Sequence, residues 1–310
     1  MGRRLRYIPP GGCVVEVTNR TIQGRYLLRP SQQLNERLIG ILGRAQRLYG
    51  VELHAFVVLS NHYHLLLTVK SALQMARFMA YFQGNLAKEA GRLHKWRGPF
   101  WHRRYQHVLV SDEEAAQIGR LRYILANSCK EKLVSSPLNW LGVNSTRALL
   151  FGEQLQGFWI NRTQECFASL KTRKDRSLFR EPENVRISPL PCWKSLRSRD
   201  RRQYARDLVT QIEAETAVRH QTEGTQPLGN ERILRLDPHD LPLRSKWSPA
   251  PMFHCASKQA QKALREAYRL FLSSFRQAAN RLQAGESFVV FPEGAFPPAM
   301  PFQEPIRAPG

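Results

Sequence analysis

Acidic residues are few in this 310-residue chain, its cysteines are scattered, and long apolar runs are missing. The five cysteines are odd in number, far apart and without a Cys-x-x-Cys pair, which argues against a disulfide framework and a zinc knuckle. No stretch approaches the roughly 20 apolar residues that span a bilayer, and no apolar signal core follows the basic start. The sequence therefore predicts a protein of a reducing cytoplasm without a membrane partner.

Positive charge is what the chain has in excess. It contains 47 Lys and Arg against 25 Asp and Glu, a net charge of +22, with a pI near 10.5. A field of that sign attracts polyanions, of which nucleic acid is the commonest; an anionic membrane surface is the alternative. A length of 310 residues favours one catalytic domain plus an extension.

The first half of the chain alternates short strand-like and longer helix-like segments. Strands are expected near residues 13–18, 51–59, 62–69 and 100–110, and helices near 31–48, 71–93 and 112–133. This order predicts an α+β fold, in which a small antiparallel sheet carries helices on one face. The other face of the sheet would be free to hold a site.

The composition and periodicity of the sequence change after about residue 150. We expect a catalytic domain at 1–150, a connecting segment at 151–195 and a basic, mainly helical extension at 196–310. In the extension, an arginine-studded helix is expected at 196–220 and an amphipathic one at 257–284. A simple linker would not need two such helices. We therefore expect that the extension packs beside the sheet and contacts DNA phosphates.

The sharpest local signal is the segment Asn61–Leu67, which reads NHYHLLL. Alternate residues of a strand share a face, so His62 and His64 point one way and Tyr63 the other, toward the covering helices. Two imidazoles on one face are spaced to share a metal ion. Taken alone, such a pair on a strand is more often incidental, or a pair of hydrogen-bonded surface histidines.

A second signal lies on the helix expected at 112–133. At about 100° per residue, Tyr123 and Asn127 fall together on the side roughly opposite the apolar stripe. The alternative is an ordinary half-exposed tyrosine. Tyr105 competes as a nucleophile but lacks a ligand-type residue at helical spacing.

In combination, these motifs resemble a known family. The motif Asn-His-x-His with an apolar run is followed by Trp101, Arg103, Arg104 and Tyr105, and then by Tyr-Ile-x-x-Asn. This order is similar to the single-tyrosine HUH transposases of bacterial insertion sequences, and most of all to the REP-associated tyrosine transposases. The similarity covers about residues 10–150 and implies an HUH, ferredoxin-like sheet.

The resemblance also implies roles. His62 and His64, with Asn127 as third ligand, would hold Mg²⁺ or Mn²⁺, and Tyr123 would attack a DNA phosphate to form a 5′-phosphotyrosine. The expected activity is that of a DNA transposase, a single-strand endonuclease and strand transferase, without a nucleotide cofactor. The chain departs from the family pattern at Ser128, where a proline is usual, and at Tyr63. Neither change removes a ligand.

Two segments are expected to bind DNA. The run FWHRRYQH interleaves rings with cations, which suits stacked bases and held phosphates in a single strand. The second segment is the arginine-studded helix expected at 196–220. For both segments, the alternative is a charged face that is merely solvated. The expected DNA-binding residues are Trp101, Arg103, Arg104, Tyr105, Arg197, Arg199, Arg201 and Arg202.

The resemblance implies single-stranded or hairpin DNA as the partner, in the bacterial cytoplasm and at the nucleoid. The sequence leaves undecided whether the protein forms a homodimer. The rival hypothesis is a non-catalytic, domesticated DNA- or RNA-binding protein that retains the fold.

Overall fold

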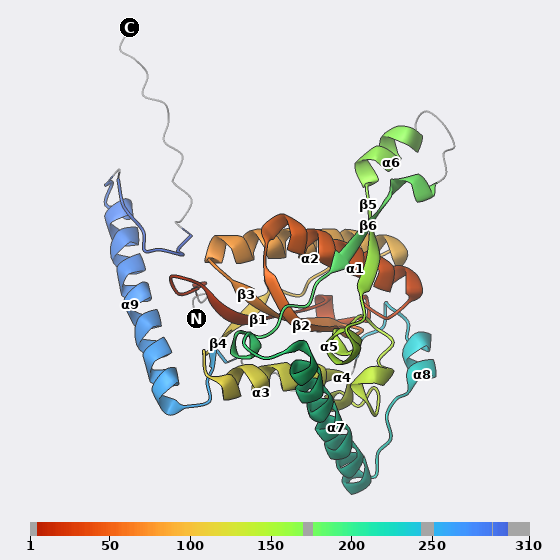
Figure 1. Cartoon of the computed structure of the whole chain (residues 1–310). Coiled ribbons are helices and arrows are strands. Elements are labelled where there is room, and N and C mark those ends of the chain that lie inside the picture. Colours follow the sequence, from red (N-terminus) through yellow and green to blue (C-terminus); the bar gives the residue numbers. More distant parts are fainter. Residues whose placement is uncertain (1–4, 170–175, 243–250, 287, 297–310) are drawn as a thin grey trace.

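A computed structural model of the chain describes residues 5–169, 176–242, 251–286 and 288–296. At its centre is a five-stranded sheet of order β2-β3-β1-β4-β7, antiparallel except for the parallel pair β4 and β7 (Figure 1). The strands are β1 (Cys13–Arg20), β2 (Glu52–Val58), β3 (His62–Val69), β4 (Gln106–Val110) and β7 (Phe253–His254). The predicted α+β fold with a small, mainly antiparallel sheet is confirmed.

Two long helices, α1 (Gln32–Tyr49) and α2 (Ala72–Leu93), cover one face of the sheet (Figure 1). The sequence predicts the ends of both helices to within two residues. Tyr63, Leu65 and Leu67 of β3 point toward these helices and are fully buried, as strand alternation requires.

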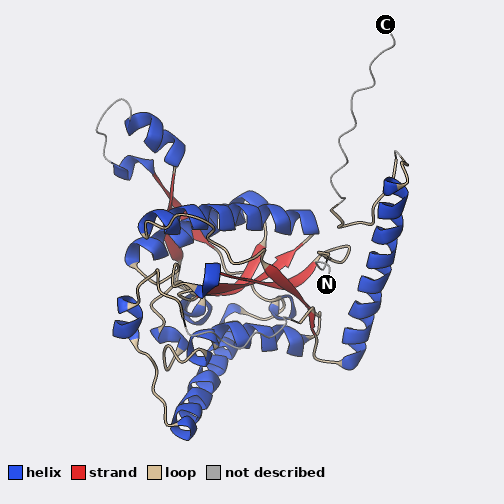
Figure 2. Ribbon diagram, turned by 180° about the vertical axis from the view of Figure 1, so that it is seen from behind, coloured by secondary structure: helices blue, strands red, loops and turns tan. Residues whose placement is uncertain are grey.

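The opposite face is covered as well, by α3 (Glu114–Leu125), the short α4 (Asn127–Lys130) and α7 (Ser198–Glu223). Figure 2 shows the sheet between the two helical layers. This differs from the expectation of helices on one face only. The physical reason is that β2 and β3 carry apolar side chains on both faces, as fully buried strands do. On the second face, Ala55, Val57 and Leu66 pack against the apolar side chains of α3 and α7.

Two predicted elements are shorter than expected. Instead of spanning 100–110, the fourth strand begins at Gln106, and the preceding residues form turns in which Trp101 makes a single bridge to Thr21. The helix expected at 112–133 is interrupted at Ala126, which separates α3 from α4.

A two-stranded arm rests on α1. It consists of β5 (Leu155–Ile160), α6 (Arg162–Ser169) and β6 (Arg180–Val185). The approach of arm and helix is close enough to require glycine, because a Cβ at Gly40 would lie 2.1 Å from the carbonyl carbon of Phe158. The segment expected to be a connection is therefore an ordered hairpin in its described parts.

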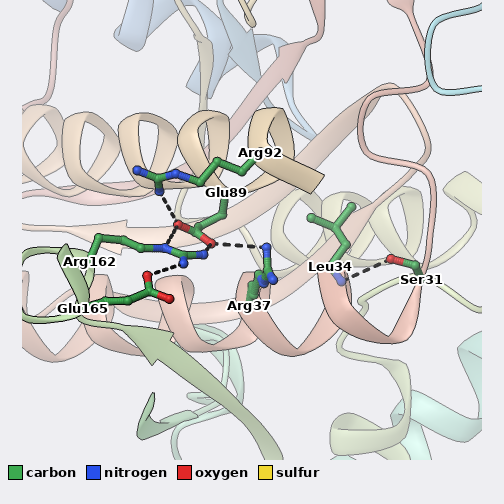
Figure 3. A network of polar contacts seen from close by, with 7 residues as sticks. All are labelled: Ser31, Leu34, Arg37, Glu89, Arg92, Arg162 and Glu165. Atoms are coloured by element: carbon green, nitrogen blue, oxygen red, sulfur yellow. Dashed lines mark hydrogen bonds and ion pairs between the residues drawn. The ribbon is translucent and has the colours of Figure 1, made fainter. Parts of the chain in front are cut away.

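A buried carboxylate ties the arm to the helical layer (Figure 3). Glu89 of α2 contacts guanidinium groups from three helices: Arg37 of α1, Arg92 of α2 and Arg162 of α6. Burial alone would raise the pKa of Glu89, but the hydrogen bonds from Arg162 and the surrounding cations outweigh it and lower the pKa. The same view shows Ser31 capping α1, because its Oγ accepts the Leu34 N–H at 3.2 Å.

The rest of the chain is mainly helical, as expected. The remaining elements are η1 (Ile22–Gly24), η2 (Pro137–Asn139), α5 (Thr146–Phe151), η3 (Arg176–Phe179), η4 (Pro191–Trp193), α8 (Asn230–Arg235) and α9 (Lys258–Gln283). Helix α9 runs along one side of the molecule (Figure 1), where Tyr268 and Phe271 pack against Tyr7. Among the described residues, no helix has the length and apolar character that crossing a bilayer requires. The division of the chain at about 150 and 195 stays a prediction.

Candidate active site

Two histidines of β3 stand side by side on the face that α3 covers. In the pairing of β3 with β1, His62 lies opposite Arg20 and His64 opposite Thr18. The two rings are buried, 5.3 Å apart between centroids and inclined at 83°. The structure thus brings the histidine pair together, as the spacing predicts.

Both histidines use the same ring nitrogen for support. His62 Nδ1 lies 2.6 Å from Oδ1 of Asn61, and His64 Nδ1 lies 2.6 Å from Oε1 of Glu16. Because both partners are acceptors, the network assigns the proton to Nδ1 and leaves a lone pair on each Nε2. Burial and the neighbouring His64 lower the pKa of His62 well below its usual value, so the ring of His62 is neutral at pH 7.

Glu16 is a member of the site that the sequence analysis missed. This β1 residue is 2% exposed, and its second oxygen forms an ion pair with Arg120 Nε of α3 at 2.5 Å. Burial alone would raise the pKa of Glu16, but the hydrogen bond with His64 and the nearby cations lower it. The sequence did offer one sign of this role: Glu16 lies between two valines in a predicted strand, and a carboxylate buried there needs a partner. Its partners follow only from the strand order.

Asn127 and Tyr123 meet the histidines from the helical side. Asn127 opens α4 and is 1% exposed; its Oδ1 accepts no regular hydrogen bond from any residue that the structure describes. Side-chain hydrogen bonding with Asn127 nevertheless acts on both rings, since it raises the pKa of His62 and lowers that of Tyr123 against larger effects of burial. The ring centroid of Tyr123 is 5.5 Å from that of His64.

Two cations flank the Tyr123 ring. The Arg120 guanidinium carbon is 4.8 Å from the ring centroid, and Lys130 Nζ is 4.6 Å from it. Burial raises the pKa of Tyr123, with Glu16 acting in the same direction, and Arg120 opposes both. The phenol is therefore half-buried in a basic setting that favours a nearby phosphate.

The donor set fits a hard divalent ion. Two imidazoles, each with Nδ1 against an acceptor, offer Nε2, and the buried Asn127 oxygen that lacks a regular partner would otherwise be costly to desolvate. Within the described ranges, no group of three or more His, Cys, Asp or Glu side chains is arranged for a metal. An amide as third ligand is consistent with that finding, because asparagine lies outside this set of residue types.

The aromatic residues expected to stack on DNA are largely turned inward. Tyr105 is 7% exposed, and its ring lies under the Arg6 guanidinium at 3.8 Å. Trp101 is half-buried against Tyr63 and donates its indole N–H to a backbone carbonyl of α2. The intervening Arg103 and Arg104 are exposed and remain available to phosphates.

The arginines of the extension lie at the start of α7, away from the histidine pair. All four are exposed or half-exposed: Arg197, Arg199, Arg201 and Arg202. The last two line a cavity of about 200 Å³ together with His54, which bonds Thr68 near the far end of β3. Six residues of strand separate Thr68 from His62, or roughly 20 Å.

Residues 20–127 match the protein family described as "Transposase IS200 like". The matched segment includes His62, His64, Tyr123 and Asn127. This match to a transposase family agrees with the resemblance found in the sequence.

The solved structures contain similar chains. One is a REP-associated tyrosine transposase bound to a REP hairpin, with 20% identity, a TM-score of 0.39, and coverage of 49% of this chain and 87% of that one. Another is a candidate transposase from Deinococcus radiodurans R1, with 22% identity, a TM-score of 0.27, and coverage of 39% and 94% respectively. None of the curated proteins matches the chain significantly.

Proposed function

We propose that this protein cleaves and rejoins single-stranded DNA through a covalent 5′-phosphotyrosine on Tyr123. The observation that carries the proposal is the convergence of Tyr123 and Asn127 on the histidine pair, from a helix and a strand about 60 residues apart in the chain. The match of residues 20–127 to a transposase family supports it.

The chemistry is a transesterification. The Tyr123 oxygen bonds to the scissile phosphorus as the bond to the 3′ oxygen breaks; the phenol proton passes to solvent and the 3′ oxygen takes up a proton. A free 3′-OH can reverse this attack on another end, so strands are exchanged without ATP. Arg120 partly offsets the rise that burial causes in the pKa of Tyr123, and Arg120 and Lys130, which lie against the ring, would contact the phosphate.

His62, His64 and Asn127 would hold Mg²⁺ or Mn²⁺ at this site. Such an ion polarises the scissile phosphate and stabilises the charge that develops on it. The acceptor on each Nδ1 fixes the orientation of the ring.

The substrate is proposed to be single-stranded DNA that carries a hairpin. One solved protein to which this chain is similar is described as bound to a REP hairpin. The net charge of +22 supports a polyanionic partner, since neutralised phosphates release counterions.

A covalent-adduct assay tests the proposal. The protein is incubated with labelled single-stranded hairpin DNA and Mn²⁺, and a slower protein–DNA band is sought on a denaturing gel. Tyr123→Phe removes only the attacking oxygen, so the adduct should vanish while DNA binding persists. Tyr105→Phe is the matched control, because the buried Tyr105 hydroxyl has no partner among the described residues and its loss should leave the adduct intact.

Two outcomes would contradict the proposal. An adduct that survives in Tyr123→Phe would assign the nucleophile to another residue. DNA binding without any adduct in the wild-type protein would favour the non-catalytic, domesticated binding protein.

A further inference from the structure

A large open cleft lies on the other side of the sheet, between the end of α2 and the loop that follows it. It has a volume of about 710 Å³, within the usual range for ligand sites. Its lining includes Gly84, Lys88, Lys95, Trp96, Arg97 and Trp101, and no residue of its lining is acidic. Of the cleft's lining residues, Phe100 and Trp101 belong to the run FWHRRYQH that was expected to bind DNA.

The cleft combines free cations with rings. Lys88, Lys95 and Arg97 are exposed, and none pairs with a carboxylate in the part of the chain that the structure describes. Trp96 and Trp101 are half-buried, and each donates its indole N–H to a backbone carbonyl. Their polar edges are thus occupied. The Trp96 ring also contacts Arg25 and His239, and the Trp101 ring contacts Tyr63 and Phe100, so a ligand would stack on the ring surface that these contacts leave exposed.

Lys95 is present at a backbone position that favours glycine. The Trp96 N–H bonds to the Gly91 carbonyl at 2.8 Å, which closes α2 in a Schellman-type turn with Lys95 at φ +53°. A left-handed conformation is costly for a residue with a Cβ. Strain of this kind is characteristic of sites where the side chain itself is needed.

Gly84 is a second costly choice in the same lining. It lies in the interior of α2, where glycine destabilises a helix relative to alanine. A Cβ built there would meet nothing within 4 Å, so packing does not require glycine. The bare helix surface at Gly84 leaves room for a ligand instead.

The cleft opens at the end of the sheet that carries His62. Trp101 bridges to Thr21, and the His102 N–H donates to the carbonyl of Arg20, which pairs with His62. Two strand spacings, roughly 10 Å of backbone, therefore separate the cleft wall from the histidine pair.

We propose that this cleft binds unpaired nucleotides of the DNA strand that Tyr123 cleaves. Bases stack on Trp96 and Trp101, and phosphates contact Lys88, Lys95 and Arg97, a combination suited to single strands. The identity of the ligand as DNA rests on the proposed function. The site lies on the α2 face of the sheet and is separate from the metal ligands.

Fluorescence anisotropy with a labelled decathymidylate, which has no hairpin, measures single-strand binding, and variants in the cleft isolate its share. Lys95→Gly removes a cation and relieves the strained backbone, so affinity should fall while the Tm stays constant or rises. The slope of log Kd against log salt should flatten by about 0.7 for each lost phosphate contact. Gly84→Glu, which places a carboxylate one turn before Lys88, should weaken binding roughly 5- to 100-fold without unfolding α2. Lys70→Gln is the charge-matched control at the opposite end of β3, and should bind as the wild type does.

The outcomes separate the two proposals. Wild-type affinity and salt slope in both Lys95→Gly and Gly84→Glu, or no binding of decathymidylate by the wild type, would overturn the cleft proposal. If the variants lose affinity but the wild type forms no adduct with hairpin DNA, the proposed cleavage fails and the binding cleft stands. If the adduct forms and the variants bind normally, the cleft proposal fails alone.

Discussion

Replacing Glu16 by glutamine tests whether the buried carboxylate beneath the histidine pair supports metal binding. The side chain keeps its shape but loses the charge that faces His64 Nδ1 and Arg120 Nε. Loss of a hydrogen-bond partner behind a metal-binding histidine typically weakens metal affinity 10- to 100-fold, or about 1.4–2.7 kcal/mol. Removing one partner of a buried ion pair also destabilises the fold, by about 3 kcal/mol at the lower end of the usual range.

A matched variant separates these two effects. Glu89→Gln removes another buried carboxylate that contacts arginines (Figure 3), on α2, which covers the sheet face opposite the histidine pair. Both variants should lower the urea midpoint. Only Glu16→Gln should weaken Mn²⁺ binding, measured by titration calorimetry on protein shown to be folded. Mn²⁺ affinity within twofold of the wild type in Glu16→Gln, or equal losses in both variants, would refute the reasoning.

Three further predictions follow from the same structure. His62→Ala should abolish adduct formation and Asn127→Ala should weaken it, as should EDTA for the wild type; full cleavage in EDTA would exclude the metal-dependent mechanism. Burial lowers the pKa of His107 from 6.5 to about 4, so the unfolded chain takes up this proton first and stability falls between pH 6.5 and pH 4. Urea unfolding measures how much the free energy of unfolding drops between pH 7 and pH 4.5. This drop should be smaller by about 2 kcal/mol in His107→Gln than in the wild type, and an equal drop in both would contradict the prediction. Neutralising the arginines at the start of α7 should flatten the salt dependence of hairpin binding by about 0.9 per lost phosphate contact, and an unchanged slope would argue against a duplex contact. These arginines are Arg197, Arg199, Arg201 and Arg202.

Much of the fold could be predicted because its signals are local. The Ser31 cap and the 3.6-residue periodicity mark α1, and the alternation in NHYHLLL assigns His62 and Tyr63 to opposite faces. The prediction of a strand was wrong over residues 100–105. Trp101 alone makes a bridge there, and the regular strand begins at Gln106. A pattern of rings and cations does not reveal whether the backbone is extended.

The site was only partly predictable, because several of its contacts join elements that are far apart in the chain. His62 and His64 follow from spacing along one strand. The contact of Glu16 with His64 depends on β1 lying between β3 and β4, an order that no local pattern specifies. Arg120 was likewise unassigned, since its pairing with Glu16 becomes evident only when α3 is placed on the sheet.

The extension is bound to the sheet by backbone hydrogen bonds as well as side chains. The Leu109 N–H donates to the Met252 carbonyl at 3.2 Å, and the Ser111 N–H donates to that of His254 at 3.0 Å. The Glu113 carboxylate, at the start of α3, accepts the Ala256 N–H at 2.9 Å.

These bonds decide how the extension should be tested. A chain truncated before residue 250 would expose the edge of β4, and edge strands with unpaired N–H groups invite aggregation. It would also lose the bond between Glu113 and Ala256, which would loosen the start of the helix that carries Tyr123. Weaker DNA binding by such a chain would not distinguish lost phosphate contacts from a displaced helix. Charge substitutions at the start of α7 leave the β4–β7 bonds intact, so a change in salt slope there reports on DNA contacts alone.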